Sequence, residues 1–356
     1  MNITFLIGNG FDLNLGLNTT YSDFVYEYKS TDSPNQNIEK FKKHIDEHEE
    51  LWSNAELELG QYTNEFNKGE ANKLSECHSD FCQHLVNYLK REEDRVDFEE
   101  HTPKIISAIS KIEEIANCFN SQEKKNIDNI FSRYIGENRY FRFVNFNYTT
   151  TLDKCINIAC NNPETLKSHT HGNKYKHEIT DNIHVHGTLD REMVFAVNDE
   201  SQIAKLDVFD CEYGEIYKNS FIKKNANDSY GENTDLKVYN LINSSTIIYI
   251  YGMSIGDTDK LWWDRICNWI SSSTDHHLIV HKFKMPPKGL LQIEYKIDEE
   301  KYKDLILSKS KLNDKNKEVV KKQIHVTDYN IFSDIYKIAN PKTISTIVKE
   351  KELVLK

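Results

Sequence analysis

The chain has 356 residues, which is enough for one large domain or two modest ones and for a sizeable core. Its 56 acidic and 45 basic residues leave a formal charge of −11, so the molecule as a whole repels a polyanion, and bulk binding of nucleic acid is not expected. The longest apolar stretch, residues 246–255, is about half as long as a membrane helix and is interrupted by Gly252, so no membrane partner is expected either.

The N-terminus and the cysteines predict a cellular compartment. Met1-Asn2-Ile3-Thr4 has no basic region before its apolar run and no small-residue cleavage site after it, so we expect a cytoplasmic protein. The seven cysteines form an odd set without a C-x-x-C pair, which argues against a zinc ribbon and against a disulfide framework. They are predicted to be reduced thiols that mostly fill the core.

In chain order, the first element is a short buried strand at residues 2–7, which ends in the turn Gly8-Asn9-Gly10. Residues 22–135 then contain few glycines or prolines and carry apolar side chains at helical spacing, as at Phe81, Leu85 and Leu89. This part of the chain is predicted to be a large helical insertion.

After the insertion, strands and helices alternate. An aromatic strand is predicted at 140–146 with a helix at 149–160 behind it, and a further helix at 257–270. The other predicted strands are 182–186, 193–197, 246–251, 277–281 and 323–327. Such alternation predicts an α/β, Rossmann-like, mostly parallel sheet with helices on both faces, formed by residues 1–21 and 136–356 and interrupted by the helical insertion 22–135. The Asn-, Lys-, Ser- and Gly-rich stretch 218–235 is expected to be a mobile loop or a lid.

In open α/β sheets, ligands bind beyond the carboxyl ends of the strands, so the residues that follow each predicted strand are candidates for chemistry. Four polar or glycine-rich motifs stand there, namely Gly8-Asn9-Gly10-Phe11-Asp12, Asn145-Phe146-Asn147-Tyr148-Thr149, His184-Val185-His186-Gly187 and Gly252-Met253-Ser254-Ile255-Gly256-Asp257. The glycine turn can bring backbone N–H groups against a phosphate. It does not complete G-x-G-x-x-G, because Leu13 takes the third position, which disfavours an ordinary dehydrogenase. Its alternative role is a tight strand-to-helix turn.

The histidines and Asn147 also have two interpretations each. His184 and His186 alternate along the predicted strand and would face the same side, where His186 can act as a general base or be a structural histidine. A second H-x-H pair, His169 and His171, leaves a metal site open as an alternative, although no carboxylate ligands are apparent. The amide of Asn147 can orient a water or a sugar hydroxyl, or it can cap the following helix.

The fourth motif has a purely structural alternative, a helix capped by Ser254 or Asp257. Trp262, Trp263 and Trp269 fall on that helix and are predicted to be core residues.

The four motifs resemble those of the AbiH family of bacterial abortive-infection proteins. The resemblance rests on Ile7 to Leu13 with Tyr21-Ser22-Asp23-Phe24, on Asn145 to Thr150, on Ile183 to Leu189 and on Tyr251 to Asp257. It implies a role in phage defence, in which an infected cell arrests or dies before the phage matures.

The same motifs, in the same order, look like a remote version of the sirtuin-like NAD-binding fold. That resemblance implies that Asn147 is the functional amide, that His186 is the base, and that Gly8, Gly10, Gly252 and Ser254 contact the cofactor. The neighbouring motif residues are candidate contacts as well, namely Asn9, Phe11, Asp12, Tyr21, Asn145, Gly187 and Asp257. The chain lacks the zinc cysteine quartet of the deacetylases, and it has Phe11-Asp12 where sirtuin-like NADases usually have small polar residues.

The leading hypothesis is therefore a defence effector that binds NAD or a related dinucleotide, without a metal, and hydrolyses the nicotinamide–ribose bond. A nucleotide-binding sensor without turnover and a metal-dependent hydrolase or nuclease with a local basic groove at Lys218, Lys223 and Lys224 are the alternatives. The helical insertion is expected to cover the pocket or to mediate self-association into a homo-oligomer.

Overall fold

The computed structural model describes residues 1–166, 174–191, 193–229, 233–256, 260–285 and 293–341. At its centre lies a sheet of six strands in the order β3-β2-β1-β4-β5-β6, and every neighbouring pair is parallel. The strands are β1 (Asn2–Ile7), β2 (Arg139–Asn145), β3 (His177–His184), β4 (Ile247–Tyr251), β5 (His277–His281) and β6 (Ile324–Thr327). This is the strand order of dinucleotide-binding α/β folds, and it confirms the predicted Rossmann-like sheet.

The predicted strands agree with β1, β2, β4, β5 and β6 to within one residue at each end. The third strand was misplaced, because β3 begins at His177 instead of residue 182 and ends at His184, so His186 follows the strand and does not lie on it. β3 is an edge strand whose residues are mostly polar and partly exposed, so it lacks the apolar run that marks the inner strands.

The predicted strand at 193–197 is wrong. Residues 194–197 are buried, but only Val197 forms a β-type pairing, an isolated bridge to Ile222. Phe195 and Val197 pack into a core made by helices, so burial there does not require a place in the sheet.

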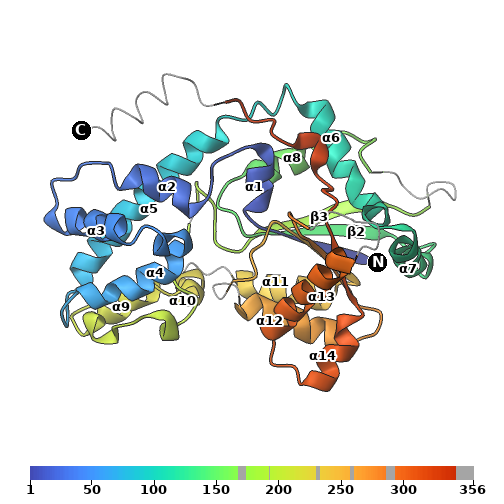
Figure 1. The fold of residues 1–356 in the computed structure, drawn as a ribbon. Coiled ribbons are helices and arrows are strands. Elements are labelled where there is room, and N and C mark those ends of the chain that lie inside the picture. The colour runs from blue at the N-terminus through green and yellow to red at the C-terminus, as the bar shows by residue number, and fades with distance from the viewer. Residues whose placement is uncertain (167–173, 192, 230–232, 257–259, 286–292, 342–356) are drawn as a thin grey trace.

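Helices cover both faces of the sheet (Figure 1). On one face lie α1 (Gly10–Leu15), α6 (Thr102–Ser110), α7 (Ser121–Ser132) and α8 (Thr151–Cys160). On the other face lie α11 (Thr234–Asn243), α12 (Lys260–Ser271), α13 (Ile293–Ser308) and α14 (Asp314–Lys321). The predicted helices at 149–160 and 257–270 correspond to α8 and α12, and residues 257–259 lie outside the described residues.

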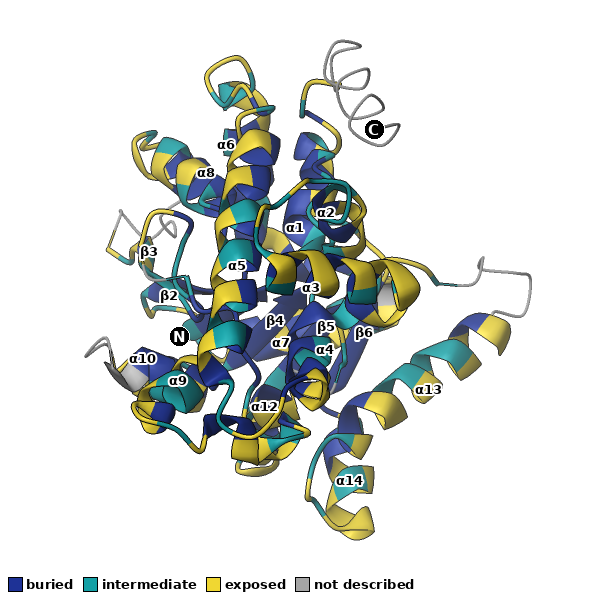
Figure 2. Ribbon diagram, turned by 90° about the vertical axis from the view of Figure 1, so that its left-hand side faces the viewer, coloured by how far each residue is buried: buried dark blue, intermediate teal, exposed yellow. Residues whose placement is uncertain are grey.

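The pleat of the strands explains why two cores form. Phe5 on β1 packs with the α6 side, whereas its neighbour Leu6 packs with the α12 side, as successive residues of a strand point to opposite faces. Trp262, Trp263 and Trp269 of α12 are buried in the second core, as predicted. Figure 2 shows the same division, with buried residues facing the sheet and exposed residues facing outward.

A third core lies beside the sheet and is built mainly by helices. Within residues 22–135, all of which the structure describes, there are helices and no strand. The helices that build this core are α2 (Tyr21–Tyr28), α3 (Gln36–Glu47), α4 (Ala55–Tyr62), α5 (Ala71–Glu93) and α9 (Gly214–Ser220), with short 3-10 helices at Leu51–Asn54, Thr63–Glu65 and Leu206–Phe209. Helix α10 (Lys223–Ser229) packs against α9 and completes this helical lobe. Three further 3-10 helices among the described residues lie at Lys111–Cys118, Glu200–Gln202 and Ser333–Ile335. The helical lobe therefore joins residues 24–89 to residues 189–222.

The stretch 218–235 is not an irregular loop in its described part. It contains the end of α9, the whole of α10 and the start of α11, and residues 230–232 lie outside the described residues. Phe221 and Ile222 are buried in the helical core, which anchors a segment whose composition alone resembles a loop. Among the described helices, none is long and apolar enough to cross a membrane.

Candidate functional site

The loops that follow β1 and β4 touch each other through their glycines. The Gly8 N–H donates to the Tyr251 carbonyl at 2.9 Å, and the Gly10 N–H donates to the Gly252 carbonyl at 2.9 Å. A Cβ on Gly10 would lie 2.3 Å from the Gly252 Cα, and Gly252 itself has a φ of +70°. Glycine is therefore required at Gly10 and Gly252, because a side chain there would prevent the two loops from approaching this closely. The N–H groups of Gly8 and Gly10 are already used, so the predicted phosphate cradle is not free at these atoms.

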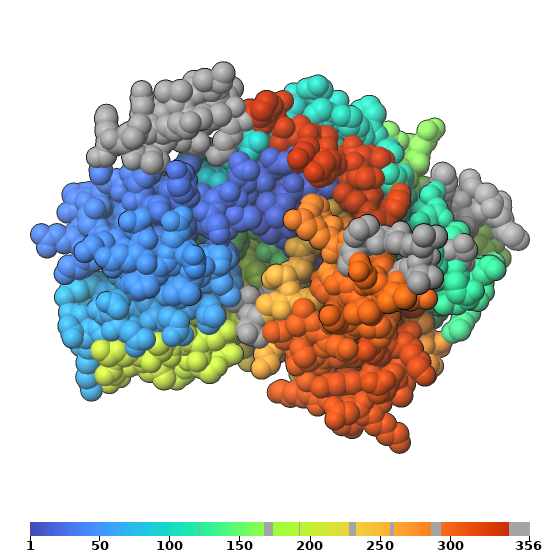
Figure 3. Space-filling view, in the orientation of Figure 1, coloured from blue at the N-terminus to red at the C-terminus, as the bar shows by residue number. Residues whose placement is uncertain are grey.

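A cleft of about 980 Å³ opens at this point, which lies beyond the carboxyl ends of β1 and β4 where the strand order reverses. The cleft is lined by the loops that follow the strands, by the helical lobe and by Tyr302 of α13. Figure 3 shows the hollow between the blue N-terminal part of the chain and the orange part that follows β5. The volume is at the upper end of the range for small-molecule and cofactor sites.

The structure brings most of the predicted site residues together on this cleft. The predicted residues that line it are Gly8, Asn9, Gly10, Asp12, Tyr21, Asn147, His186, Gly252 and Ser254. Phe11, Asn145 and Gly187 do not line it. Phe11 is buried and packs edge-on against Phe332, Asn145 is buried beneath Asn147, and Gly187 makes a turn with a φ of +71°. Asp257 lies outside the described residues.

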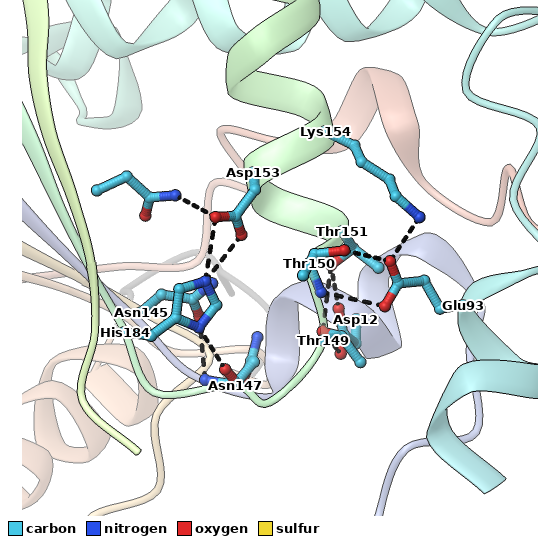
Figure 4. Close-up of polar contacts among 11 residues, drawn as sticks. Asp12, Glu93, Asn145, Asn147, Thr149, Thr150, Thr151, Asp153, Lys154 and His184 are labelled. Atoms are coloured by element: carbon cyan, nitrogen blue, oxygen red, sulfur yellow. Dashed lines mark hydrogen bonds and ion pairs between the residues drawn. The ribbon is translucent and has the colours of Figure 1, made fainter. Parts of the chain in front are cut away.

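Asn147 is held by three hydrogen bonds. Its N–H donates to Oδ1 of Asn145 at 3.0 Å, and its carbonyl accepts from Nδ1 of His184 at 2.9 Å (Figure 4). Its Nδ2 donates to the Gly8 carbonyl at 3.2 Å. Among the described residues, none donates to its amide oxygen. Asn147 therefore offers the cleft a fixed hydrogen-bond acceptor, as a residue that orients a hydroxyl or a water must do.

His186 is buried in the wall of the cleft, and its Nδ1 has no hydrogen-bond partner among the described residues. Its ring lies edge-on to Phe146, 5.9 Å between ring centroids, and near Tyr148 at 6.4 Å. Burial lowers the pKa of His186 well below its usual range, and the nearby charges of Lys223 and His184 lower it further. The imidazole is therefore neutral at neutral pH and can accept a proton.

The sequence interpretation missed a buried ion pair in the part of the cleft that the helical lobe forms. Lys223 of α10 lies 2.7 Å from Oε2 of Glu56 on α4, and both side chains line the cleft while being almost wholly buried. The hydroxyls of Tyr21 and Tyr148 lie 3.0 Å and 3.2 Å from Oε1 of Glu56. Burial and the Glu56 charge raise the pKa values of both tyrosines, so both keep the protons that they donate.

No local signal in the sequence marks Glu56. It stands in an acidic, amphipathic segment, where a glutamate is normally solvated, and its partner is 167 residues away. Lys223 was noted only as part of a basic groove. Neither it nor Lys218 is free for that purpose, because Lys218 pairs with Glu200 and Glu215 on the surface.

Asp12 joins α1 to the loop that carries Asn147. Its carboxylate accepts hydrogen bonds from the hydroxyls of Thr149 at 2.6 Å and Thr151 at 2.5 Å (Figure 4). Burial raises the pKa of Asp12 to about 6, although the two threonine hydroxyls act in the opposite direction. Asp12 is therefore a buried acid that holds the loop in place from the side opposite to His184.

Among the described residues, no group of three or more His, Cys, Asp or Glu side chains is arranged to hold a metal ion. His169 and His171, two of the four histidines considered for such a site, lie outside those residues. His184 is occupied by Asp153, at 2.9 Å and 3.1 Å from its two carboxylate oxygens.

The family model of the bacteriophage abortive infection protein AbiH matches residues 4–281, which is most of the chain and includes all four motifs. No curated protein and no solved structure matches the chain. The match confirms the resemblance read from the motifs and assigns the chain to phage defence by abortive infection. The protein belongs to the AbiH family.

Proposed function

We propose that this protein is an abortive-infection effector that binds NAD, or a close dinucleotide relative, in the cleft and hydrolyses its nicotinamide–ribose bond. The observation that carries the proposal is the convergence of Asn147 and His186 on one cleft beside the β1/β4 switch point. Switch points of open α/β sheets are where such folds bind nucleotides. The motif resemblance to sirtuin-like NAD-binding proteins supports the same ligand.

In the proposed reaction, the bond between the ribose C1′ and the nicotinamide nitrogen breaks, and nicotinamide leaves with the bonding electron pair as a neutral molecule. A water then adds to the ribose cation and loses one proton, so the products are nicotinamide, ADP-ribose and a proton. Asn147 offers its amide oxygen to orient the water or a ribose hydroxyl, and neutral His186 accepts the proton.

The pyrophosphate needs a different partner from the one that the glycine turn suggested. Because the N–H groups of Gly8 and Gly10 donate inside the protein, we assign the phosphates to polar groups at the rim of the cleft. Ser254 is exposed there, and Lys337 supplies a positive charge. The −11 net charge makes such a local cation necessary, since the overall field repels an anionic ligand.

One observation favours the second candidate, a sensor that binds a nucleotide without turning it over. Burial lowers the pKa of His186, and the charges of Lys223 and His184 lower it further, which weakens His186 as a base and disfavours activation of a water. The sensor predicts tight binding by calorimetry and no release of nicotinamide over hours.

The test is incubation of the purified protein with NAD, followed by chromatography for nicotinamide, with His186→Ala and Asn147→Ala in parallel. General-base catalysis contributes about 10² to 10⁴ in rate, so we expect either substitution to cost about 10² or more. His276→Ala is the matched control, because His276 lies before the start of β5, at the amino-terminal end of the strands, and does not line the cleft. Equal turnover in wild type and His186→Ala would refute the assignment of the base, and binding without turnover in the wild type would favour the sensor.

A further inference from the structure

The residue that stands out beyond the proposed chemistry is His184, which lies at the end of β3 and does not line the cleft. Its ring is almost buried, and both of its nitrogens have partners (Figure 4). Nδ1 lies 2.9 Å from the Asn147 carbonyl, and Nε2 lies 2.9 Å from a carboxylate oxygen of Asp153 on α8.

The partners dictate the state of the ring. A backbone carbonyl has no proton to give, so Nδ1 must donate, and an ionised carboxylate can only accept, so Nε2 must donate as well. An imidazole that donates at both nitrogens is an imidazolium, and its positive charge strengthens both hydrogen bonds. Asp153 is itself fixed by Nδ2 of Asn182 at 2.8 Å. The ring is therefore held by α8 and β3, and it points one charged N–H at Asn147.

We infer that His184, oriented by Asp153, is the positioning residue that sets the direction of the Asn147 amide in the cleft. The effect of His184 on turnover rests on the proposed function, whereas its effect on the orientation of Asn147 does not. The Asn147 carbonyl, N–H and Nδ2 are each tied to a different element, namely His184 on β3, Asn145 on β2 and Gly8 after β1. Loss of the His184 contact frees one of these three anchors and lets the loop rotate about the other two.

Two substitutions separate this role from a general structural one. In His184→Asn, the amide nitrogen can take the place of Nδ1 and still donate to the Asn147 carbonyl, but the contact with Asp153 is lost. In His184→Gln, the amide nitrogen can take the place of Nε2 and still donate to Asp153, but the contact with Asn147 is lost. The two variants are matched controls for each other, since both remove the charge and the ring.

We expect His184→Gln to lower kcat by about 10², with little change in KM, because misplacement of a catalytic group by about 1 Å has this effect. His184→Asn should stay within about threefold of wild type, as its donor to Asn147 remains and the uncharged contact still fixes the loop. In ¹⁵N-labelled protein, the side-chain amide resonances of Asn147, identified with Asn147→Ala, should move in His184→Gln and stay in place in His184→Asn.

The amide resonances report on positioning even if the wild-type protein does not hydrolyse NAD, so failure of the proposed function and failure of this inference are distinguishable. The inference is overturned if both variants shift the Asn147 resonances equally, if neither does, or if only His184→Asn does. Thermal unfolding of both variants, measured in the same buffer, shows whether either one loses the fold. If one does, Asp153→Asn replaces it, and this variant keeps the ring but removes the carboxylate that orients it.

Discussion

The buried pair Glu56–Lys223 gives the sharpest stability prediction, because it joins two helices of the helical lobe through one charged contact of 2.7 Å. The perturbation is Glu56→Gln, which keeps the size of the side chain and removes its charge. Lys223 then remains almost wholly buried, and the described residues provide no other carboxylate partner for its ammonium group.

An uncompensated buried charge costs about 3–5 kcal/mol, so Glu56→Gln should destabilise the helical lobe by that amount. If Lys223→Met is added, no charge remains, and replacement of a buried ion pair by neutral groups is often close to neutral in stability. The double variant should therefore recover about 2 kcal/mol or more relative to Glu56→Gln. Glu47→Gln is the control, since Glu47 forms an exposed pair with Lys43, and such pairs contribute about 1 kcal/mol or less.

The assay has to report on the lobe itself, because a chain of this size need not unfold in a single step. Hydrogen exchange of peptides from α4 and α10, followed by mass spectrometry, gives the local free energy of opening. Urea unfolding followed by fluorescence is a second measurement, in which Trp52 reports on the helical core and the three tryptophans of α12 report on the sheet. A double variant as unstable as the sum of its single variants would refute the reasoning.

Three further predictions follow from the same contacts. Gly252→Ala should lower the free energy of unfolding by about 2–4 kcal/mol, because it combines a positive φ with a Cβ 2.5 Å from the Gly10 Cα. Gly136→Ala also has a positive φ, but its Cβ would meet the side chain of Tyr175 at 3.3 Å or more, so it should lose about 1–2 kcal/mol in the same denaturant titration. Burial raises the pKa of Asp12 from 3.8 to about 6, so this group stabilises the folded state fully below pH 3.8, and the stabilisation is lost as the pH rises through 6. The free energy of unfolding of Asp12→Asn relative to wild type should therefore grow by roughly 3 kcal/mol between pH 4 and pH 7. A difference that does not vary with pH would contradict this. All seven cysteines are free thiols and Cys160 is the exposed one, so a thiol reagent should modify one site rapidly in the native protein, and Cys160→Ser should abolish that phase.

The loop from Asn145 to Thr151 explains how the family motif and the fold depend on each other. His184 and Asp153 hold its first half, and Asp12 and Glu93 hold its second half through threonine hydroxyls and backbone. Most polar groups of this loop are therefore bound by residues from other parts of the chain, and the amide oxygen of Asn147 is left for the cleft. This arrangement is typical of a site in which supporting residues fix the group that meets the ligand.

The sequence by itself determined the inner strands and the polar ends of those strands. Strands buried on both faces appear as continuous apolar runs, so β1, β4 and β5 and the glycines that follow β1 and β4 could be located from local pattern alone. The same pattern placed Asn147 and His186 at one edge of the sheet, because parallel strands end on the same side.

Only the tertiary structure decided what those residues meet. The glycines are needed for contact between two loops 242 residues apart along the chain. A glycine-rich motif looks the same in sequence whether it serves such a contact or phosphate binding. The edge strand β3 and the buried run at 193–197 were misjudged, since burial against a sheet and burial against helices leave the same apolar signal. The Glu56–Lys223 pair had no local signal at all, because the folded chain alone brings the two charges together and removes them from water.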